Sequence, residues 1–203
     1  MENTTVENKG NTKWIIWGVI IFVVVSLIGT FFGRYNNFVS MEEGVKTAWS
    51  QVENQYQRRY DLIPNIVNTV KGEANFEKST LEAVVNARAS ATKTNININD
   101  AKEMADYQQQ QAGISQALSK LLMVTESYPT LKANQGFADL RVTLEGTENR
   151  IGTERMRYNE VVNQFNVAIR QFPGNIIASM FGFEKKNLFE ADTKAKEAPK
   201  VEF

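Results

Sequence analysis

Charged and amide side chains crowd one short segment that could bind an anion. Arg58 and Arg59 precede Asp61, and Asn65 directly follows Pro64. A guanidinium group binds carboxylate or phosphate oxygens with two parallel hydrogen bonds, so this Arg58–Asn65 cluster fits an anion or a peptide carboxylate. The structural alternative has Asp61 capping a helix and an arginine pairing with a carboxylate of a neighbouring helix. Arg59 falls on the apolar face of its helix, where an unpaired charge is costly, which favours this structural role.

Two residue types on which many catalytic sites depend are absent. The chain contains no histidine and no cysteine, which excludes histidine-based triads, imidazole zinc sites, Glu-x-x-His di-iron bundles and thiolate nucleophiles. Carboxylates such as Glu145 and Glu148 lie on single helix faces and do not converge as metal ligands would. Glutamines 108 to 111 are typical of an exposed face. We expect no catalytic residue, cofactor or metal ion, and no enzymatic activity; an enzyme using the Arg58–Asn65 cluster is the less favoured alternative.

The overall composition is that of a folded, electrically neutral protein. Of the 203 residues, 42% are hydrophobic and 23% are charged, which is close to globular averages. There are 23 Lys and Arg residues against 23 Asp and Glu residues, and the isoelectric point is ≈ 6.4. A nucleic-acid-binding domain typically has an isoelectric point above about 9 and clustered basic residues. We therefore expect no nucleic-acid partner.

The run from Trp14 to Phe32 contains no charged residue. A helix of this length spans roughly 29 Å, close to the thickness of the hydrocarbon core of a bilayer. Aromatic residues stand at both ends of the run, as at membrane interfaces. A cleaved signal peptide would have a shorter apolar region followed by small residues. We therefore predict a short N-terminal tail over residues 1–13 and a single transmembrane helix over 14–33, which contacts membrane lipids through Trp14 to Phe32.

Positive charges near the two ends of the apolar run are balanced. Lys9 and Lys13 precede it, and Arg34 and Lys46 follow it. Because orientation follows an excess of Lys and Arg on the cytoplasmic side, this tie leaves both orientations open.

Four segments after the span repeat apolar residues at alternating spacings of three and four, the pattern of a bundle helix. No comparable period-two segment appears, so no strand is expected. The pattern predicts an all-α fold, an antiparallel up-down-up-down four-helix bundle over residues 34–183. The apolar faces include Tyr35, Phe38, Val45, Trp49, Val52 and Tyr56; Val67, Val70, Ala74, Leu81, Val84 and Ala91; Met104, Tyr107, Ile114, Leu118, Leu121 and Tyr128; and Phe137, Leu140, Leu144, Ile151, Tyr158, Val161, Phe165, Ala168 and Phe172.

Helix boundaries are marked by proline and by capping residues. Pro64 disrupts a helix interior, so we expect a turn near residues 60–63 with Asp61 capping the second helix. Asp100 with Glu103 has the form of a capping box that opens the third helix. Pro129 ends that helix, and Pro173 ends the fourth.

Two appendages follow the bundle. Apolar residues after Asn175 predict a short helix that covers one end of the core, with contact to a membrane or a partner as the alternative. From Glu184 onward the chain is rich in Lys, Glu, Asp and Ala. We expect residues 184–203 to be a charged, mobile tail, although its last six residues, APKVEF, could dock on the bundle or on a partner.

Several of these strings together resemble the LemA family of small bacterial proteins. They include RRYDLIPN at 58–65, YPTLKAN at 128–134, RMRYNEVVNQFNVAIRQFPGN at 155–175, FGF at 181–183 and the final APKVEF. The resemblance covers nearly everything after the apolar run. It implies an N-terminal transmembrane helix, an antiparallel helical bundle and a place in the bacterial cell (inner) membrane, but no agreed biochemical activity.

The resulting functional hypothesis is a membrane-anchored helical interaction or scaffold module. Anchoring raises the effective concentration of any protein in the same membrane, so modest contacts along a helix face would suffice for assembly. The expected partners are membrane lipids and membrane proteins not identified by the sequence, including further copies of this chain. The alternatives are a bundle that binds a peptide or lipid, or an enzyme of the cell envelope.

Overall fold

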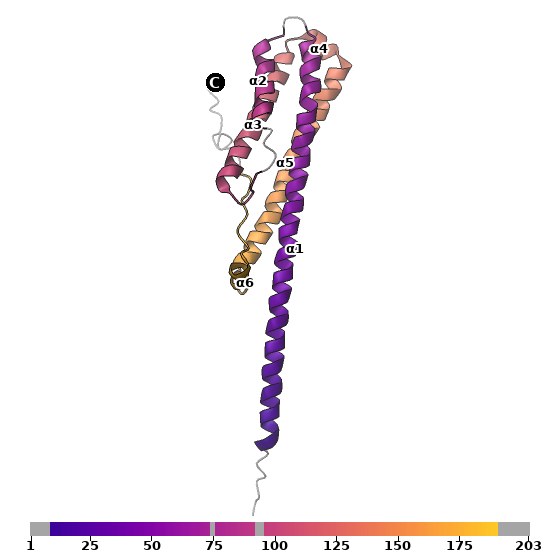
Figure 1. Cartoon of the computed structure of the whole chain (residues 1–203). Coiled ribbons are helices and arrows are strands. Elements are labelled where there is room, and N and C mark those ends of the chain that lie inside the picture. Colours follow the sequence, from indigo (N-terminus) through magenta and orange to yellow (C-terminus); the bar gives the residue numbers. More distant parts are fainter. Residues whose placement is uncertain (1–8, 74–75, 92–95, 191–203) are drawn as a thin grey trace, which may run out of the picture.

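The computed structural model describes residues 9–73, 76–91 and 96–190. Within these residues the chain forms helices, turns and loops but no strand, which confirms the all-α prediction. One very long helix extends far beyond the others, which gather around its upper half (Figure 1). The helices are α1 (Lys9–Lys71), α2 (Lys78–Ser90), α3 (Ala101–Thr125), α4 (Pro129–Ala133), α5 (Gln135–Arg170) and α6 (Gly174–Phe181).

The first half of α1 stands apart from the rest of the described chain. It is long and apolar enough to cross a membrane, and from Trp14 to Phe32 every side chain is exposed except that of Phe31, which is half-buried. The helix begins at Lys9, before the predicted start of the span, and continues without a break into the part of the molecule that is packed. We call Trp14–Phe32 the span and residues 34–190 the head.

The predicted turn at residues 60–63 is wrong, because α1 runs through Pro64 to Lys71. Proline inside a helix removes one backbone hydrogen bond and costs about 3 kcal/mol. The apolar face of α1 continues across the proline: Ile63 and Ile66 are 1% and 0% exposed. Burying two such side chains contributes about 3 to 6 kcal/mol, which offsets the cost of the proline. The turn comes after Lys71, and α2 begins at Lys78.

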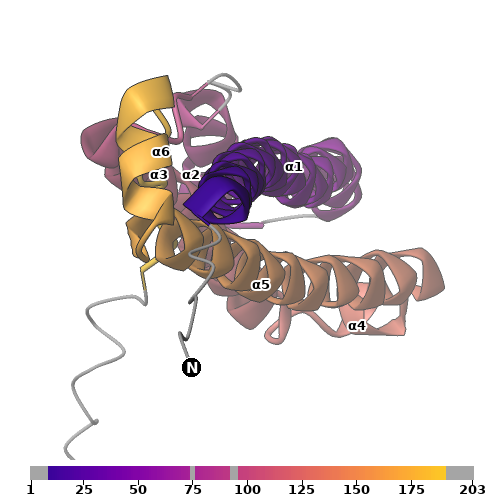
Figure 2. The ribbon, with the colours of Figure 1, turned by 90° about the horizontal axis from the view of Figure 1, so that it is seen from below.

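The head is built from two helix pairs. α5 returns along α1, and α2 lies against α3. Seen from below, α1 lies between the α2–α3 pair and α5 (Figure 2). The core between the pairs follows the predicted apolar faces. It includes Phe38, Val45, Val52, Tyr56, Val84, Met104, Ile114, Leu121, Leu144, Tyr158 and Phe165, each at most 2% exposed.

The start of α3 agrees with the capping residue predicted from the sequence. Asp100 Oδ1 accepts hydrogen bonds from the backbone N–H groups of Lys102 and Glu103, at 2.8 and 3.1 Å. The Glu103 carboxylate accepts from the backbone N–H of Asn97 and so holds the preceding loop instead of closing a capping box. At α5, Asn134 Oδ1 accepts from the backbone N–H of Phe137 at 3.0 Å.

The predicted boundary at Glu184 lies too early. Residues 184–190, which we call the strap, run beside α5, and two asparagine side chains hold its backbone. Asn166 donates to the carbonyl of Lys186 and accepts from its N–H, both at 2.9 Å. Asn159 forms the same two bonds with Phe189, at 3.0 and 2.8 Å. Seven helical residues rise about 10.5 Å, close to the length of three extended residues, so the two clasps are in register.

The strap also buries an aromatic ring in the core. Phe189 is 6% exposed and stacks on Trp49, with ring centroids 5.7 Å apart. The side-chain ammonium of Lys186 reaches Glu42 on α1 at 2.6 Å. The strap is thus part of the head, whereas the remainder of the predicted tail, residues 191–203, lies outside the described residues.

α6 closes the lower end of the head, as the apolar residues after Asn175 predict. Ile177 and Ala178 are each 4% exposed, so one face of α6 covers the core. Phe172 differs from its prediction: it is 81% exposed instead of buried. The reason is that α5 ends at Arg170, so the helical spacing no longer fixes the direction of Phe172.

Candidate functional site

Arg59 is the most deeply buried charged side chain of the predicted cluster. Its side chain is 1% exposed and pairs with Glu148 on α5, with 3.0 Å between Arg59 Nη1 and Glu148 Oε1. The same nitrogen donates to Ser115 Oγ at 2.8 Å, and Ser115 in turn donates to Glu148 Oε2 at 3.1 Å. The second guanidinium nitrogen donates to the side-chain oxygen of Gln111. An arginine paired with a carboxylate of a neighbouring helix is the arrangement that the structural interpretation describes.

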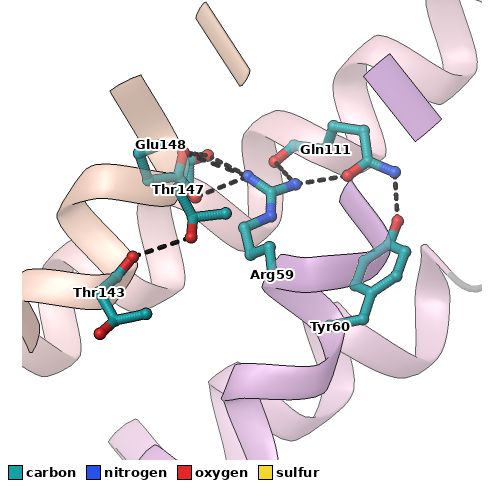
Figure 3. A network of polar contacts seen from close by, with 7 residues as sticks. Arg59, Tyr60, Gln111, Thr143, Thr147 and Glu148 are labelled. Carbon is teal, nitrogen blue, oxygen red and sulfur yellow. Dashed lines mark hydrogen bonds and ion pairs between the residues drawn. The ribbon is translucent and has the colours of Figure 1, made fainter. Parts of the chain in front are cut away.

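The hydrogen bonds continue from Arg59 across the head (Figure 3). The amide nitrogen of Gln111 donates to Tyr60 Oη, and Tyr60 Oη donates to the carbonyl of Ala91, just after α2, at 2.9 Å. We call Arg59, Tyr60, Gln111, Ser115 and Glu148 the Arg59 network. Its members come from α1, α3 and α5, and its last acceptor follows α2. It therefore ties the α2–α3 pair to the α1–α5 pair.

The other members of the predicted cluster do not join Arg59. Arg58, Asp61 and Asn65 are exposed, and Pro64 is half-buried. Asp61 does not cap a helix: it lies inside α1, where it accepts a hydrogen bond from Gln57 Nε2 at 2.8 Å. Because α1 continues through Pro64, successive side chains point to different sides of the helix, and these residues do not form the anion pocket of the alternative interpretation.

Burial keeps the phenol groups around the network neutral. Burial raises the pKa of Tyr56 to about 12, with the positive charges of Arg155 and Arg59 acting weakly in the opposite direction. Burial likewise raises the pKa of Tyr60, against the hydrogen bond from Gln111. The pKa of Tyr107 is raised by the same cause. A base or nucleophile needs a pKa near the working pH, so these phenols are suited to packing and hydrogen bonding.

Sequence reasoning missed three members of the network. Gln111 was expected on an exposed face but is 4% exposed, and Glu148 was expected to be solvated but pairs with Arg59. Ser115 was not singled out. The available signal was periodicity: Gln111 lies four residues after Tyr107 and three before Ile114, so it falls on the apolar face of α3.

The surface of the head carries one large groove along α3. It has a volume of ≈ 1070 Å³ and lies between α3 and the strap, with Arg155 of α5 at its edge. Small and amide residues form its α3 wall, among them Ala105, Gln109, Ala112 and Gly113. Gln108 accepts a hydrogen bond from the backbone N–H of Glu190 at 3.0 Å, so the strap forms part of the opposite wall. The α3 wall thus accepts a hydrogen bond from the backbone of the strap, as it would from the backbone of a bound peptide.

Metal ligands do not gather in the part of the chain that the structure describes. Within residues 9–73, 76–91 and 96–190, no group of three or more Asp or Glu side chains could hold a metal ion.

Comparison with known proteins places these features in a family. The model of the LemA family matches residues 48–203. The chain is 26% identical to magnetosome protein MamQ 2 of Paramagnetospirillum magneticum over 191 residues, which covers 85% of this chain and 70% of that protein. It is 24% identical to magnetosome protein MamQ of Magnetospirillum gryphiswaldense, covering 86% and 71% of the two chains.

A third relative is protein LemA of Metamycoplasma hominis. It is 25% identical over 176 residues, which covers 85% of this chain and 77% of that protein. The family model spans α2 to α6 completely, α1 from residue 48 onward and all of the Arg59 network. On this match, the chain belongs to the LemA family.

Proposed function

We propose that this protein is a membrane-anchored helical interaction module of a bacterial inner membrane, without catalytic activity of its own, that works as a scaffold within a membrane protein assembly. Its head would be an up-down-up-down four-helix bundle, and its span would cross the bilayer once. The observation that carries the proposal is the continuity of α1, which forms the exposed span and the central helix of the head as one element.

A continuous helix gives the head a fixed orientation relative to the span. α1 has 63 residues, with an exposed apolar span and, from Phe38 onward, an apolar face buried in the core. A flexible linker would let the head take many orientations relative to the span, whereas a continuous helix keeps one. Confinement to the membrane then raises the effective concentration of co-anchored partners.

The polar chemistry of the head supports binding over catalysis. The Arg59 charge is neutralised by Glu148 and enclosed by Gln111 and Ser115, so it is occupied by the fold itself. Arg58 and Asp61 lie on the exposed surface without forming a joint pocket with Arg59.

The proposal is tested by crosslinking in intact native membranes. The tagged full-length chain is crosslinked, purified and examined by mass spectrometry, beside a version that lacks residues 1–33. We expect a reproducible set of membrane proteins at near-stoichiometric amounts, lost when residues 1–33 are removed. Recovery of the full-length chain without partners would contradict the scaffold role.

The groove along α3 favours a second candidate, a bundle that binds a peptide in extended form. The strap already occupies one side of the groove through backbone bonds to Asn159, Asn166 and Gln108. Filling the groove by Ala112→Trp should then abolish capture of a peptide-like partner, whereas Val142→Trp, at an exposed position of α5, should not. Capture unaffected by Ala112→Trp would rule out this candidate.

A further inference from the structure

α6 lies beside the C-terminal end of the span. The ring of Phe181 lies 4.6 Å from that of Tyr35 and 5.8 Å from that of Phe31, measured between centroids. Phe31 is the penultimate residue of the apolar run. In Figure 1, α6 lies at the lowest point of the head, and only α1 extends below it. α6 therefore stands at the height where the span meets the head.

α6 has two apolar faces and no charged residue. Its inner face packs on the core: a side chain added at Gly174 would lie 2.8 Å from Phe38 Cζ. Its outer face is exposed, with Ile176 at 52%, Met180 at 66% and Phe181 at 48%. Phe172, just before α6, is 81% exposed. We call Phe172, Ile176, Met180 and Phe181 the basal patch.

The neighbours of the basal patch identify its occupant. The patch continues the exposed apolar surface of the span, where Ile28 and Phe32 are 50% and 59% exposed. Exposed basic residues flank it at the upper end of the span, at the end of α5 and after α6: Arg34, Arg170 and Lys185, with Glu184 as the acidic neighbour. An apolar face bordered by basic side chains is typical of helices that lie in the interface of a bilayer.

We propose that the basal patch inserts into the interfacial layer of the same bilayer that the span crosses. This inference rests on the membrane anchoring in the proposed function. The head is then attached at two points, through the span and through α6. A single helix can rotate and tilt in a bilayer, whereas a second contact beside it restricts both motions and fixes which faces of the head point along the membrane.

The absence of cysteine makes the proposal directly testable. Full-length Met180→Cys and Phe172→Cys variants are labelled with an environment-sensitive fluorophore and reconstituted in vesicles of phosphatidylcholine and phosphatidylglycerol. Nitroxide groups on the lipids near the headgroup then report contact with the bilayer. Val142→Cys is the matched control, because Val142 is 67% exposed but lies on α5 in the upper head. We expect the basal-patch labels to be quenched at least about twofold more strongly than the label at 142.

A label in the span separates this inference from the proposed function. Leu27→Cys, at a position 65% exposed in α1, should be quenched whenever the chain is anchored. An unquenched label at 27 would overturn the anchoring itself. A quenched label at 27 with labels at 172 and 180 no more quenched than that at 142 would overturn only the insertion of the basal patch. In a further outcome, the labels at 172 and 180 are shielded from aqueous iodide but are not quenched by the lipid nitroxides. This result would assign the patch to a protein partner or a second copy, and it would likewise overturn insertion into the bilayer.

Discussion

Arg59 occupies a position that an apolar side chain would normally fill. It lies between Tyr56 and Ile63 on the buried face of α1, and its guanidinium also lies over the ring of Tyr56, with Cζ 5.1 Å from the ring centroid. Its Nε atom has no hydrogen-bond partner among the described residues. The positive charge of Arg59 is therefore neutralised by Glu148, the carboxylate that pairs with it.

We predict that the single variant Glu148→Ala destabilises the head much more than the double variant Glu148→Ala/Arg59→Met. The single variant leaves a guanidinium that is 1% exposed without an anion, at a cost of about 3–5 kcal/mol. The double variant removes the stranded charge and recovers much of that loss. Denaturant unfolding of the full-length protein in detergent, followed by circular dichroism, measures both.

Glu145→Ala provides the matched control for this experiment. Glu145 lies on the same helix, is 53% exposed and pairs with the exposed Arg141 at 3.0 Å. Its loss should cost less than about 1 kcal/mol. Equal losses for the two glutamates would contradict a special role for the buried pair.

Alkaline pH should destabilise the head through its buried tyrosines. Tyr56 has a pKa of about 12 in the folded state, against about 10 when unfolded. The unfolded state therefore binds fewer protons between pH 10 and 12, and stability falls as the pH rises, by up to about 1.4 kcal/mol per pH unit for each such tyrosine. Tyr56→Phe removes this titrating group, so the slope of the unfolding free energy against pH should become shallower by up to about 1.4 kcal/mol per pH unit. The slope is measured from pH 9 to 11.5. Equal slopes for both proteins would contradict the prediction.

The strap shows what an element can hide from sequence reasoning. Its composition, EKKNLFE at residues 184–190, resembles a solvated tail. Its attachment depends on Asn159 and Asn166, whose seven-residue spacing matches the strap only when the two segments lie side by side. Such a match between distant segments leaves no local pattern.

The helices themselves were largely predictable, because each buries one face. The spacing of three and four located the core positions of α3 and α5, and Asp100 marked the start of α3. Pro64 was misread, because its local cost was weighed without the burial of Ile63 and Ile66 on either side. Asp61 was misassigned as a helix cap for the same reason, since that role assumed a turn before Pro64.

Removing one asparagine clasp should release the strap without unfolding the helices. Asn166→Ala leaves the N–H and carbonyl of Lys186 without partners in a buried setting, at a cost of about 1–3 kcal/mol for each group. We expect faster hydrogen exchange over residues 184–190, measured by mass spectrometry, while the centres of α1 and α5 keep their protection.

The control for the strap is Asn163→Ala, on the same helix but exposed. It should leave exchange in the strap unchanged. Unchanged exchange in the Asn166→Ala variant would show that the Asn159 clasp and the burial of Phe189 hold the strap without Asn166.

At the scale of the whole molecule, the span and the head share a helix but almost no tertiary contacts. Phe31 is the one half-buried residue between Trp14 and Phe32, and its contacts are with Phe32 and Phe181. The core of the head begins at Phe38. The packing within the head should therefore be enough to keep it folded. The bilayer would position the head without stabilising it.

We predict that a chain lacking residues 1–30 folds like the full-length head. The truncation removes no buried described residue and keeps Phe31 and Tyr35, which pack on Phe181. A surface side chain contributes within about 0.5 kcal/mol, so the unfolding midpoint should match that of the full-length chain, compared by circular dichroism in the same detergent. The basal patch remains exposed, so the truncated chain should also float with anionic vesicles, less so after Met180→Ser. A truncated chain without cooperative unfolding would instead show that the head depends on its span, and would place the stability of this fold in the membrane.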